Sequence, residues 1–380
     1  MKIDLTRIST DFKGEYCFTH ARSAIRPDGF GVMTTQPLRL SGSDIFYGMY
    51  ISTTKDFGKT WTPLVPSKTL TRQPMGNGLE MVMCDVTPFY HKASGKIIAL
   101  GHCALYLNDE MAPDPHERYT PYAVYDEETG DFGRIEIIEM PKDENDTYYS
   151  SGNGSGQSLE LDNGDMLIPF YFLSKKEASD PWHSCYSSAV MRCSFDGQHF
   201  TCLEIGNSLS VSVPRGLCEP SIVAFDGGYY LALRNDESGY VSRGKDGLHF
   251  EEPKELVFDD GENVGNYCTQ QHWITGGGKL WMVYTRRGAN NDEIFRHRAP
   301  LFIAEFDTER MCLIRASEQV AVPKRGARLG NFGCQSLPDG RGVVTVSEWM
   351  QTTAPDYFNW RRCVELGSDN SIFVSFVTFD

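Results

Sequence analysis

A glutamate and an arginine stand at the two ends of one short segment, Glu219 to Arg234. Between them, two apolar runs flank the turn Asp226-Gly227-Gly228. Aspartate and glycine supply the backbone conformations that tight turns require, so the segment predicts a β-hairpin. A hairpin returns its ends to the same side, and we therefore expect the Glu219 carboxylate and the Arg234 guanidinium to face one surface. Such a pair could bind an anion and move a proton.

Further arginines are expected at similar strand ends, in a chain whose formal net charge is −15. A guanidinium binds a carboxylate through paired hydrogen bonds and stays charged at any working pH. Arginines that converge would form an anion pocket, and the alternative is that each pairs with a nearby acid, as Arg298 with Glu305. The candidate ligand-binding side chains at these ends are His20, Arg22, His102, Arg234, Arg298, Arg328, Asn331 and Glu348.

The turn and strand of this hairpin recur six times along the chain. Each turn is a dipeptide whose second residue is a glycine. These turn glycines are Gly29, Gly95, Gly164, Gly228, Gly278 and Gly340, with gaps of 66, 69, 64, 50 and 62 residues. Strands and turns at such a period are typical of small sheets arranged radially, whereas a β-sandwich has no fixed period of this length. We therefore predict an all-β fold, a six-bladed β-propeller of four-stranded antiparallel blades, as a single domain over residues 1–380.

A second motif, at residues 54–61, has the pattern Asp-x-Gly-x-x-Trp, in which the Asp56 side chain closes a turn. Shorter copies occur at residues 194–200 and 245–250, where the outer strands of a blade would turn. These copies resemble the Asp-box (BNR) repeats of the sialidase superfamily, and the resemblance extends over nearly the whole chain. It implies a hydrolase that acts on an acidic sugar, although Asp-boxes also occur in other propellers and by themselves indicate the fold.

The resemblance implies roles for particular residues. The family holds the substrate carboxylate with three arginines, which match Arg22, Arg234 and Arg298. Glu219, in Glu-Pro-Ser, matches the glutamate that activates the nucleophile of the family, and Asp44 lies where the family has its acid/base.

The tyrosine nucleophile of that family has no counterpart at its expected place in the sixth blade. Asn331 or Phe332 stands there instead, so Tyr267 or Tyr357 would have to substitute. The predicted catalytic residues are therefore Asp44, Glu219 and Tyr267. If water replaced the tyrosine, the reaction would invert the anomeric centre.

Three functions remain open at this point. The leading prediction is a sialidase-like exo-glycosidase that releases a sialic acid, or a related ulosonic or uronic sugar, from oligosaccharides. The second is a polysaccharide lyase or another glycosidase on the same propeller, with Arg234 on the carboxylate and His102 or His272 as the base. The third is a non-catalytic propeller that binds sugars by stacking on tryptophans such as Trp182, Trp349 and Trp360.

Composition narrows the possible partners. The negative net charge argues against nucleic acid. The first residues lack the apolar core of a signal peptide and no stretch is long enough to span a membrane, so the prediction is a cytoplasmic protein without a membrane partner. Eleven cysteines scattered singly fit neither a disulfide framework nor a zinc site. We therefore expect neither a metal nor a cofactor, and the resemblance to the sialidase superfamily implies a carbohydrate partner.

Overall fold

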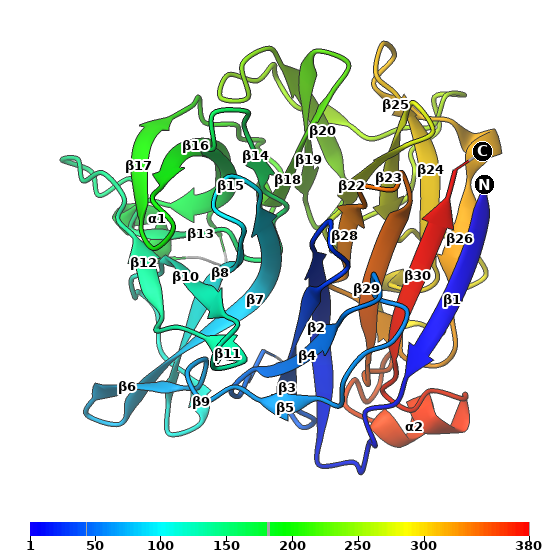
Figure 1. Ribbon diagram of the computed structural model, residues 1–380, viewed down its shortest axis with the longest axis horizontal. Helices are drawn as coiled ribbons and strands as arrows, with labels where there is room; N and C mark the ends of the chain where they lie inside the picture. The colour runs from blue at the N-terminus through cyan, green and yellow to red at the C-terminus, as the bar shows by residue number, and fades with distance from the viewer. Residues whose placement is uncertain (43, 181–182, 380) are drawn as a thin grey trace. The chain divides into compact units, whose positions relative to one another are not determined.

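The computed structural model describes residues 1–42, 44–180 and 183–379, which form six antiparallel sheets (Figure 1). Each of the six predicted glycine turns connects two neighbouring strands of one sheet, so the predicted repeat is confirmed. The chain divides into two compact units, Met1–Pro66 with Leu256–Asp380 and Ser67–Glu255, and each unit contains three of the sheets. The single domain over residues 1–380 stays a prediction.

The first unit is built from the two ends of the chain. One sheet contains β2 (Tyr16–Ile25), β3 (Gly31–Arg39), β4 (Tyr50–Thr54) and β5 (Val65–Pro66). A second contains β22 (His272–Gly276), β23 (Lys279–Tyr284), β24 (Leu301–Asp307), β25 (Cys312–Leu313) and β26 (Gln319–Val322). The third contains β27 (Arg328–Leu329), β28 (Gly333–Ser336), β29 (Gly342–Trp349), β30 (Ile372–Thr378) and β1 (Lys2–Ile8). The short helices of this unit are η1 (Phe295–His297), η2 (Arg315–Ser317) and α2 (Trp360–Glu365).

The second unit contains the middle of the chain. Its first sheet contains β6 (Gln73–Gly76), β7 (Leu79–His91), β8 (Lys96–Leu107), β9 (Glu110–Met111), β10 (Thr120–Asp126), β11 (Asp131–Phe132) and β12 (Glu136–Ile138). The next contains β13 (Ser150–Gly152), β14 (Leu159–Glu160), β15 (Met166–Leu173), β16 (Ser187–Phe195) and β17 (Phe200–Ile205), with helix α1 (Lys175–Ala178) after β15. The last contains β18 (Cys218–Phe225), β19 (Gly228–Arg234), β20 (Tyr240–Gly244) and β21 (Lys254–Glu255).

The N-terminal strand completes the C-terminal sheet. Strand β1 pairs antiparallel with β30, from Lys2 opposite Thr378 to Ile8 opposite Ile372, and the two strands lie side by side in Figure 1. Strand β30 in turn pairs with β29. The outermost strand of this sheet therefore comes from the opposite end of the chain, and both ends are needed to build it.

Apolar side chains from neighbouring sheets pack together within each unit. In the first unit, residues of the second and third sheets form one buried cluster that includes Ile274, Leu301, Ile303, Val344, Val346, Phe373 and Val377. Burial of such side chains is the main favourable contribution to folding. This packed apolar core therefore holds in place the strands that carry the candidate site residues.

The aspartate turns between the outer strands are confirmed. Asp56 accepts hydrogen bonds from the backbone N–H and hydroxyl of Thr60, at 2.9 and 2.6 Å. In the first sheet, the N–H of Phe57 also donates to the carbonyl of Gly29, so the Asp-box and the hairpin turn lie on the same side. The same aspartate closure occurs at Asp196 and Asp246, as predicted, and also at Asp126 and Asp307.

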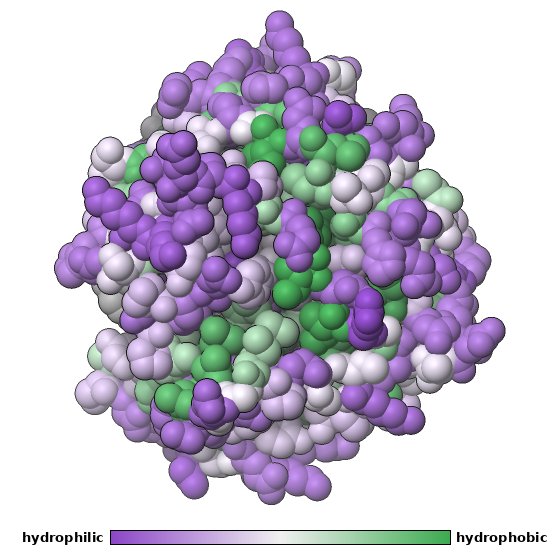
Figure 2. Space-filling view, turned by 90° about the vertical axis from the view of Figure 1, so that its left-hand side faces the viewer, coloured by the Kyte–Doolittle hydropathy of each residue, from purple (hydrophilic) through white to green (hydrophobic). Residues whose placement is uncertain are grey.

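The drawn surface is mostly polar. Polar and charged residues cover most of the face drawn in Figure 2, and apolar residues show between them. Within the part of the chain that the structure describes, no helix is long and apolar enough to cross a membrane.

Candidate functional site

A residue with positive φ recurs at an equivalent position in each sheet, in or shortly before the strand that leads to the turn glycine. It lies nine or ten positions before the turn glycine of its sheet, and its φ is between 47° and 60°. In β2, β7 and β18 the pairing register shifts at this point, which marks a β-bulge that re-aims the local side chains. The six residues are His20, Asp85, Ser155, Glu219, Cys268 and Asn331.

Three of these six residues, His20, Glu219 and Asn331, were predicted from the sequence as site residues. Ser155 and Cys268 were missed because no motif in the sequence marks either of them. Their constant distance from the turn glycine is the sequence signal that could have revealed them. Bulges are frequent beside functional sites, so the repeat marks the end of each sheet where a ligand is expected.

In the first unit, Asn331 connects two predicted site residues. Its side-chain amide donates to Nε2 of His20 at 2.7 Å, and its oxygen accepts from Arg298 at 3.3 Å. Burial first, and then the charge of Arg22, hold the pKa of His20 well below its ordinary value, so His20 is neutral and can accept this bond. Asn331 therefore positions both of these neighbours through its side-chain amide.

Arg22 is fully buried beside this network. Its Nε donates to the carbonyl oxygens of Asn331 and Phe332, each at 3.1 Å. A Cβ on Gly333 would lie 2.9 Å from Cγ of Arg22, so only glycine allows this close approach. Arg22 thus binds to the same segment that carries Asn331.

Arg328 is a buried cation that faces aromatic rings. It is 2% exposed, and its guanidinium carbon lies 3.4 Å from the ring centre of Trp349 and 5.1 Å from that of Phe295. Among the residues that the structure describes, its Nε and Nη1 have no hydrogen-bond partner, and neither has Nε1 of Trp349. Three buried donor atoms therefore meet at one strand pair, since Arg328 is directly opposite Trp349.

Arg328 lies near the positive charges of two other arginines. Burial, and then the positive charges of Arg298 and Arg296, hold the pKa of Arg328 well below its ordinary value. The negative charge of Asp44 acts in the opposite direction on both Arg328 and His20. Asp44 itself is exposed, with φ at 61°, in the loop after β3. The predicted acid/base is therefore within electrostatic reach of the arginine cluster.

Tyr267 lies half-buried before β22. Its hydroxyl is 2.5 Å from Nδ1 of His297, and Nε2 of His297 is 3.2 Å from the Asp292 carboxylate. The guanidinium of Arg287 lies over the tyrosine ring, 4.5 Å from its centre. The guanidinium of Arg298 donates to the carbonyl of Cys268, the residue that follows Tyr267. A phenol with a basic partner is thus placed next to the arginine cluster.

In the second unit, the two ends of the opening hairpin meet as predicted. Arg234 donates to Glu219 at 2.5 Å and to Asp236 at 3.0 Å. Within the described residues, the second Glu219 oxygen, Oε2, has no hydrogen-bond partner. Both the glutamate and the arginine are buried, so the pair is a strong local interaction that a ligand would have to share.

His102, on β8, is also buried in the second unit. Burial lowers the pKa of its imidazole to about 3, so the ring is neutral and only weakly basic near pH 7. Its ring lies 5.6 Å from that of Tyr171, and a Cβ on Gly152 would lie 2.2 Å from its Nδ1. These contacts indicate a packed histidine, which weakens the role of general base considered for it.

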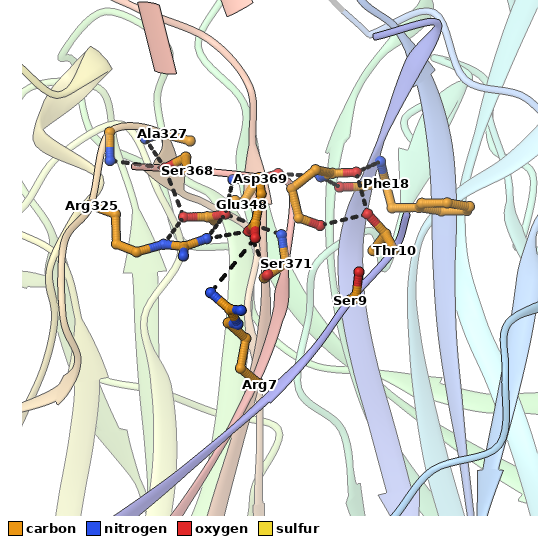
Figure 3. Close-up of polar contacts among 12 residues, drawn as sticks. Arg7, Ser9, Thr10, Phe18, Arg325, Ala327, Glu348, Ser368, Asp369 and Ser371 are labelled. Carbon is orange, nitrogen blue, oxygen red and sulfur yellow. Dashed lines mark hydrogen bonds and ion pairs between the residues drawn. The ribbon is translucent and has the colours of Figure 1, made fainter. Parts of the chain in front are cut away.

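Glu348 lies in a network of protein donors (Figure 3). Its carboxylate is 1% exposed and accepts two hydrogen bonds from Arg325, at 2.8 and 2.6 Å. It also accepts from the Ser368 hydroxyl at 2.7 Å and from the N–H groups of Asp369 and Ser371, each at 3.1 Å. Five protein donors occupy the carboxylate, which favours a role of Glu348 in the support of the sheet, and the ligand contact stays a prediction.

The tryptophans considered for sugar stacking differ in environment. Trp349 lies in the arginine cluster, whereas Trp360 packs edge-on against Phe12, with ring centres 5.4 Å apart. Trp182 lies outside the described residues. Tyr357, the other candidate nucleophile, is 45% exposed and its ring lies 5.1 Å from that of Phe295.

No protein-family model matches this chain, and no curated protein matches it. Solved structures do. A Dyadobacter fermentans protein of unknown function has a TM-score of 0.65 at 14% identity, with 100% of this chain and 99% of that chain covered. Trypanosoma rangeli sialidase has a TM-score of 0.62 at 12% identity, with 100% and 60% covered. The NanB sialidase of Streptococcus pneumoniae has a TM-score of 0.62 at 12% identity, with 97% and 71% covered.

The similarity to sialidase propeller domains extends over the whole chain, and the fold is an all-β, sialidase-like propeller. This chain spans about three fifths of the length of the T. rangeli sialidase. The T. rangeli enzyme has been solved with sialic acid and, as a covalent intermediate, with 2,3-difluorosialic acid. At this identity the likeness establishes the fold, and the chemistry has to be argued from the residues.

Proposed function

We propose that this protein is a sialidase-like exo-glycosidase that releases a sialic acid or a related acidic sugar. One observation carries the proposal: the Arg328 guanidinium is buried, it lies among like charges, and two of its nitrogens have no hydrogen-bond partner among the described residues. A buried charge without a partner is costly, and a substrate carboxylate would supply the missing acceptor. Arg298 belongs to the same cluster and would share this anion.

The remaining roles follow from the chemistry of each group. Asp44, exposed and within electrostatic reach of Arg328, would protonate the leaving oxygen. Asn331 would hold Arg298 and His20 in place through its two hydrogen bonds. The family resemblance implies Arg234 as an anion-binding residue and Glu219 as an activating base; both residues lie in the second unit, and these two roles stay predictions.

Binding and turnover test the proposal separately. Calorimetry with free sialic acid should show saturable binding, and a fluorogenic sialoside should be hydrolysed. Arg328→Lys should weaken both by roughly 10- to 100-fold, because a charge-assisted hydrogen bond of about 1.5–3 kcal/mol is lost. Arg341→Lys is the control, because Arg341 pairs with Asp339 at a hairpin turn. Equal effects of the two changes would refute the role of Arg328.

A second function, sugar binding without catalysis, is favoured by Asn331. An asparagine in place of the family tyrosine supports the network but cannot attack a glycoside. Binding of sialic acid without hydrolysis of any glycoside in a fluorogenic panel would support this second function. Absorbance from a new double bond in uronate-containing polysaccharides would select a lyase, for which the low pKa of His102 is unfavourable.

A further inference from the structure

The proposed function leaves the nucleophile open, and the first unit contains a group suited to the task. We propose that Tyr267 attacks the anomeric carbon and that His297 is the base that takes its proton. This inference rests on the proposed function, and it replaces the glutamate base expected from the family with a histidine. The Tyr267 hydroxyl and Nδ1 of His297 are 2.5 Å apart, which is hydrogen-bond distance for proton transfer.

The backbone holds His297 in an unusual conformation. Arg296 and His297 both have positive φ, 55° and 52°, inside the short helix η1. The buried Asn291 side chain donates to the carbonyl oxygens of His297 at 3.3 Å and Ala299 at 2.8 Å, which ties both ends of this turn. Consecutive left-handed residues persist only where surrounding contacts fix them, and such positions cluster at functional sites. The turn thus directs the imidazole at the tyrosine.

The charges around Tyr267 suit a developing phenolate. Burial, and then Cys268, raise the pKa of the phenol, so the hydroxyl keeps its proton in the resting state. Arg287, Arg296 and Arg298 act in the opposite direction. Positive charge that is already in place stabilises an anion when it forms. Tyr267 therefore needs a base to start the attack, and three arginines stabilise the product of that proton transfer.

Asp292 is the outer member of this group. Its carboxylate lies 3.2 Å from Nε2 of His297, and it is 95% exposed, whereas the His297 side chain is 25% exposed. An ion pair this open contributes little because water screens it. Asp292 is thus a positioning residue that favours the tautomer with a proton on Nε2, which leaves Nδ1 free to accept the tyrosine proton.

The proposed double displacement balances as follows. The Tyr267 oxygen forms a bond to the anomeric carbon, and its proton passes to Nδ1 of His297. The bond from that carbon to the aglycone oxygen breaks, and the oxygen takes the proton of the Asp44 carboxyl group. Water then attacks the anomeric carbon and gives one proton to Asp44. The tyrosine oxygen leaves and recovers its proton from His297, so the configuration is retained.

A structural bond between Tyr267 and His297 is the competing explanation. The chain offers a matched histidine–carboxylate pair in which catalysis is not expected: Nδ1 of His249 lies 2.8 Å from Asp246 in an aspartate turn. His249→Asn is therefore the control for His297→Asn. Both changes remove one imidazole near the surface, and thermal unfolding of each variant reports any loss of structure.

The experiment uses 2,3-difluorosialic acid on the full chain. We expect the intact mass to rise by one glycosyl group, and peptide mapping to place the label on Tyr267. His297→Asn should slow the labelling by about 10²- to 10⁴-fold, the range for acid–base assistance, and added imidazole should restore part of the rate. Tyr267→Phe should abolish the label while sialic acid still binds in calorimetry, and His249→Asn should label at the wild-type rate.

Each of the other possible outcomes refutes one part of the proposal. A label on another residue, or turnover without any label, overturns the assignment of Tyr267 and leaves the proposed function standing. Labelling of Tyr267 that His297→Asn does not slow, or that imidazole does not rescue, overturns the role of His297. Absence of sialic acid binding and of turnover overturns the proposed function together with this inference. Mapping of the wild-type label needs no variant, so misfolding of Tyr267→Phe does not obscure the result.

Discussion

Replacement of Glu348 by glutamine should destabilise the protein strongly while leaving ligand chemistry intact. One carboxylate oxygen, Oε2, accepts hydrogen bonds from Nη2 of Arg325 and from the N–H groups of Asp369 and Ser371. The other oxygen, Oε1, accepts from Nε of Arg325 and from the Ser368 hydroxyl. In glutamine one of these oxygens becomes an NH₂ donor, so at least two donors lose their acceptor in a site that is 1% exposed.

The magnitude follows from the partners that are lost. Breaking a buried ion pair by removal of one charge costs about 3–5 kcal/mol. Because Arg325 is 21% exposed and can still reach Asp369, we expect Glu348→Gln to fall near the lower end, about 3 kcal/mol. Urea unfolding followed by circular dichroism measures this difference, with Glu365→Gln as the control, since its partner Arg362 and Glu365 are both exposed.

The result also separates two roles for Glu348. If the carboxylate supports the sheet, the free energy of unfolding falls and the affinity for sialic acid, measured well below the unfolding transition, stays at the wild-type value. If the carboxylate contacts the ligand, as the sequence suggested, affinity falls and stability does not. A loss of stability under about 1 kcal/mol would refute the reasoning from buried donors.

Two further predictions concern stability. His102 and His272 both have a folded-state pKa of about 3, below the unfolded value near 6.5, so protonation favours the unfolded chain and stability falls as the pH drops from 6.5 towards 3. His102→Gln should reduce this fall by up to about 1.4 kcal/mol per pH unit, as urea unfolding at pH 7, 6 and 5 will show, and an unchanged pH slope would contradict the burial argument. Asp56→Ala removes the acceptor of three side-chain and backbone bonds in the first aspartate turn and should cost about 1–2 kcal/mol. A shift of the thermal midpoint measures this cost, and a neutral effect would mean that the turn forms without its aspartate.

The repeat could be predicted from the sequence because its signal is local. Glycines recur in the hairpin turns at positions 29, 95, 164, 228, 278 and 340, and this recurrence predicted the number of sheets. All of them except Gly228 have the positive φ that favours glycine, and in that turn Gly227 has it instead. The turns at Asp126 and Asp307 were missed because no glycine follows them in the Asp-box pattern, although their side chains close the same bonds. A turn that several residue types can form is harder to predict from the sequence than a turn that requires glycine.

Partners of the site residues were harder to predict because they are distant in sequence. Glu348 looked like a ligand group, and its true donors, Arg325, Ser368 and Ser371, lie 20 or more residues away. The pairing of Arg234 with Glu219 follows from the hairpin, but its strength depends on burial that no local pattern shows. The contact between Tyr267 and His297 depends on the left-handed turn at Arg296 and His297, which no local pattern in the sequence predicted.

The pairing of β1 with β30 sets an order of events for folding. Residue 2 must find residue 378, so this contact closes a very long loop, and we expect it to form late. Strand β29 borders β30 and also carries Trp349 opposite Arg328. The arginine cluster should therefore reach its final geometry only after the last strand has joined the first. A chain in which β1 has not yet joined β30 would therefore carry an incomplete anion site.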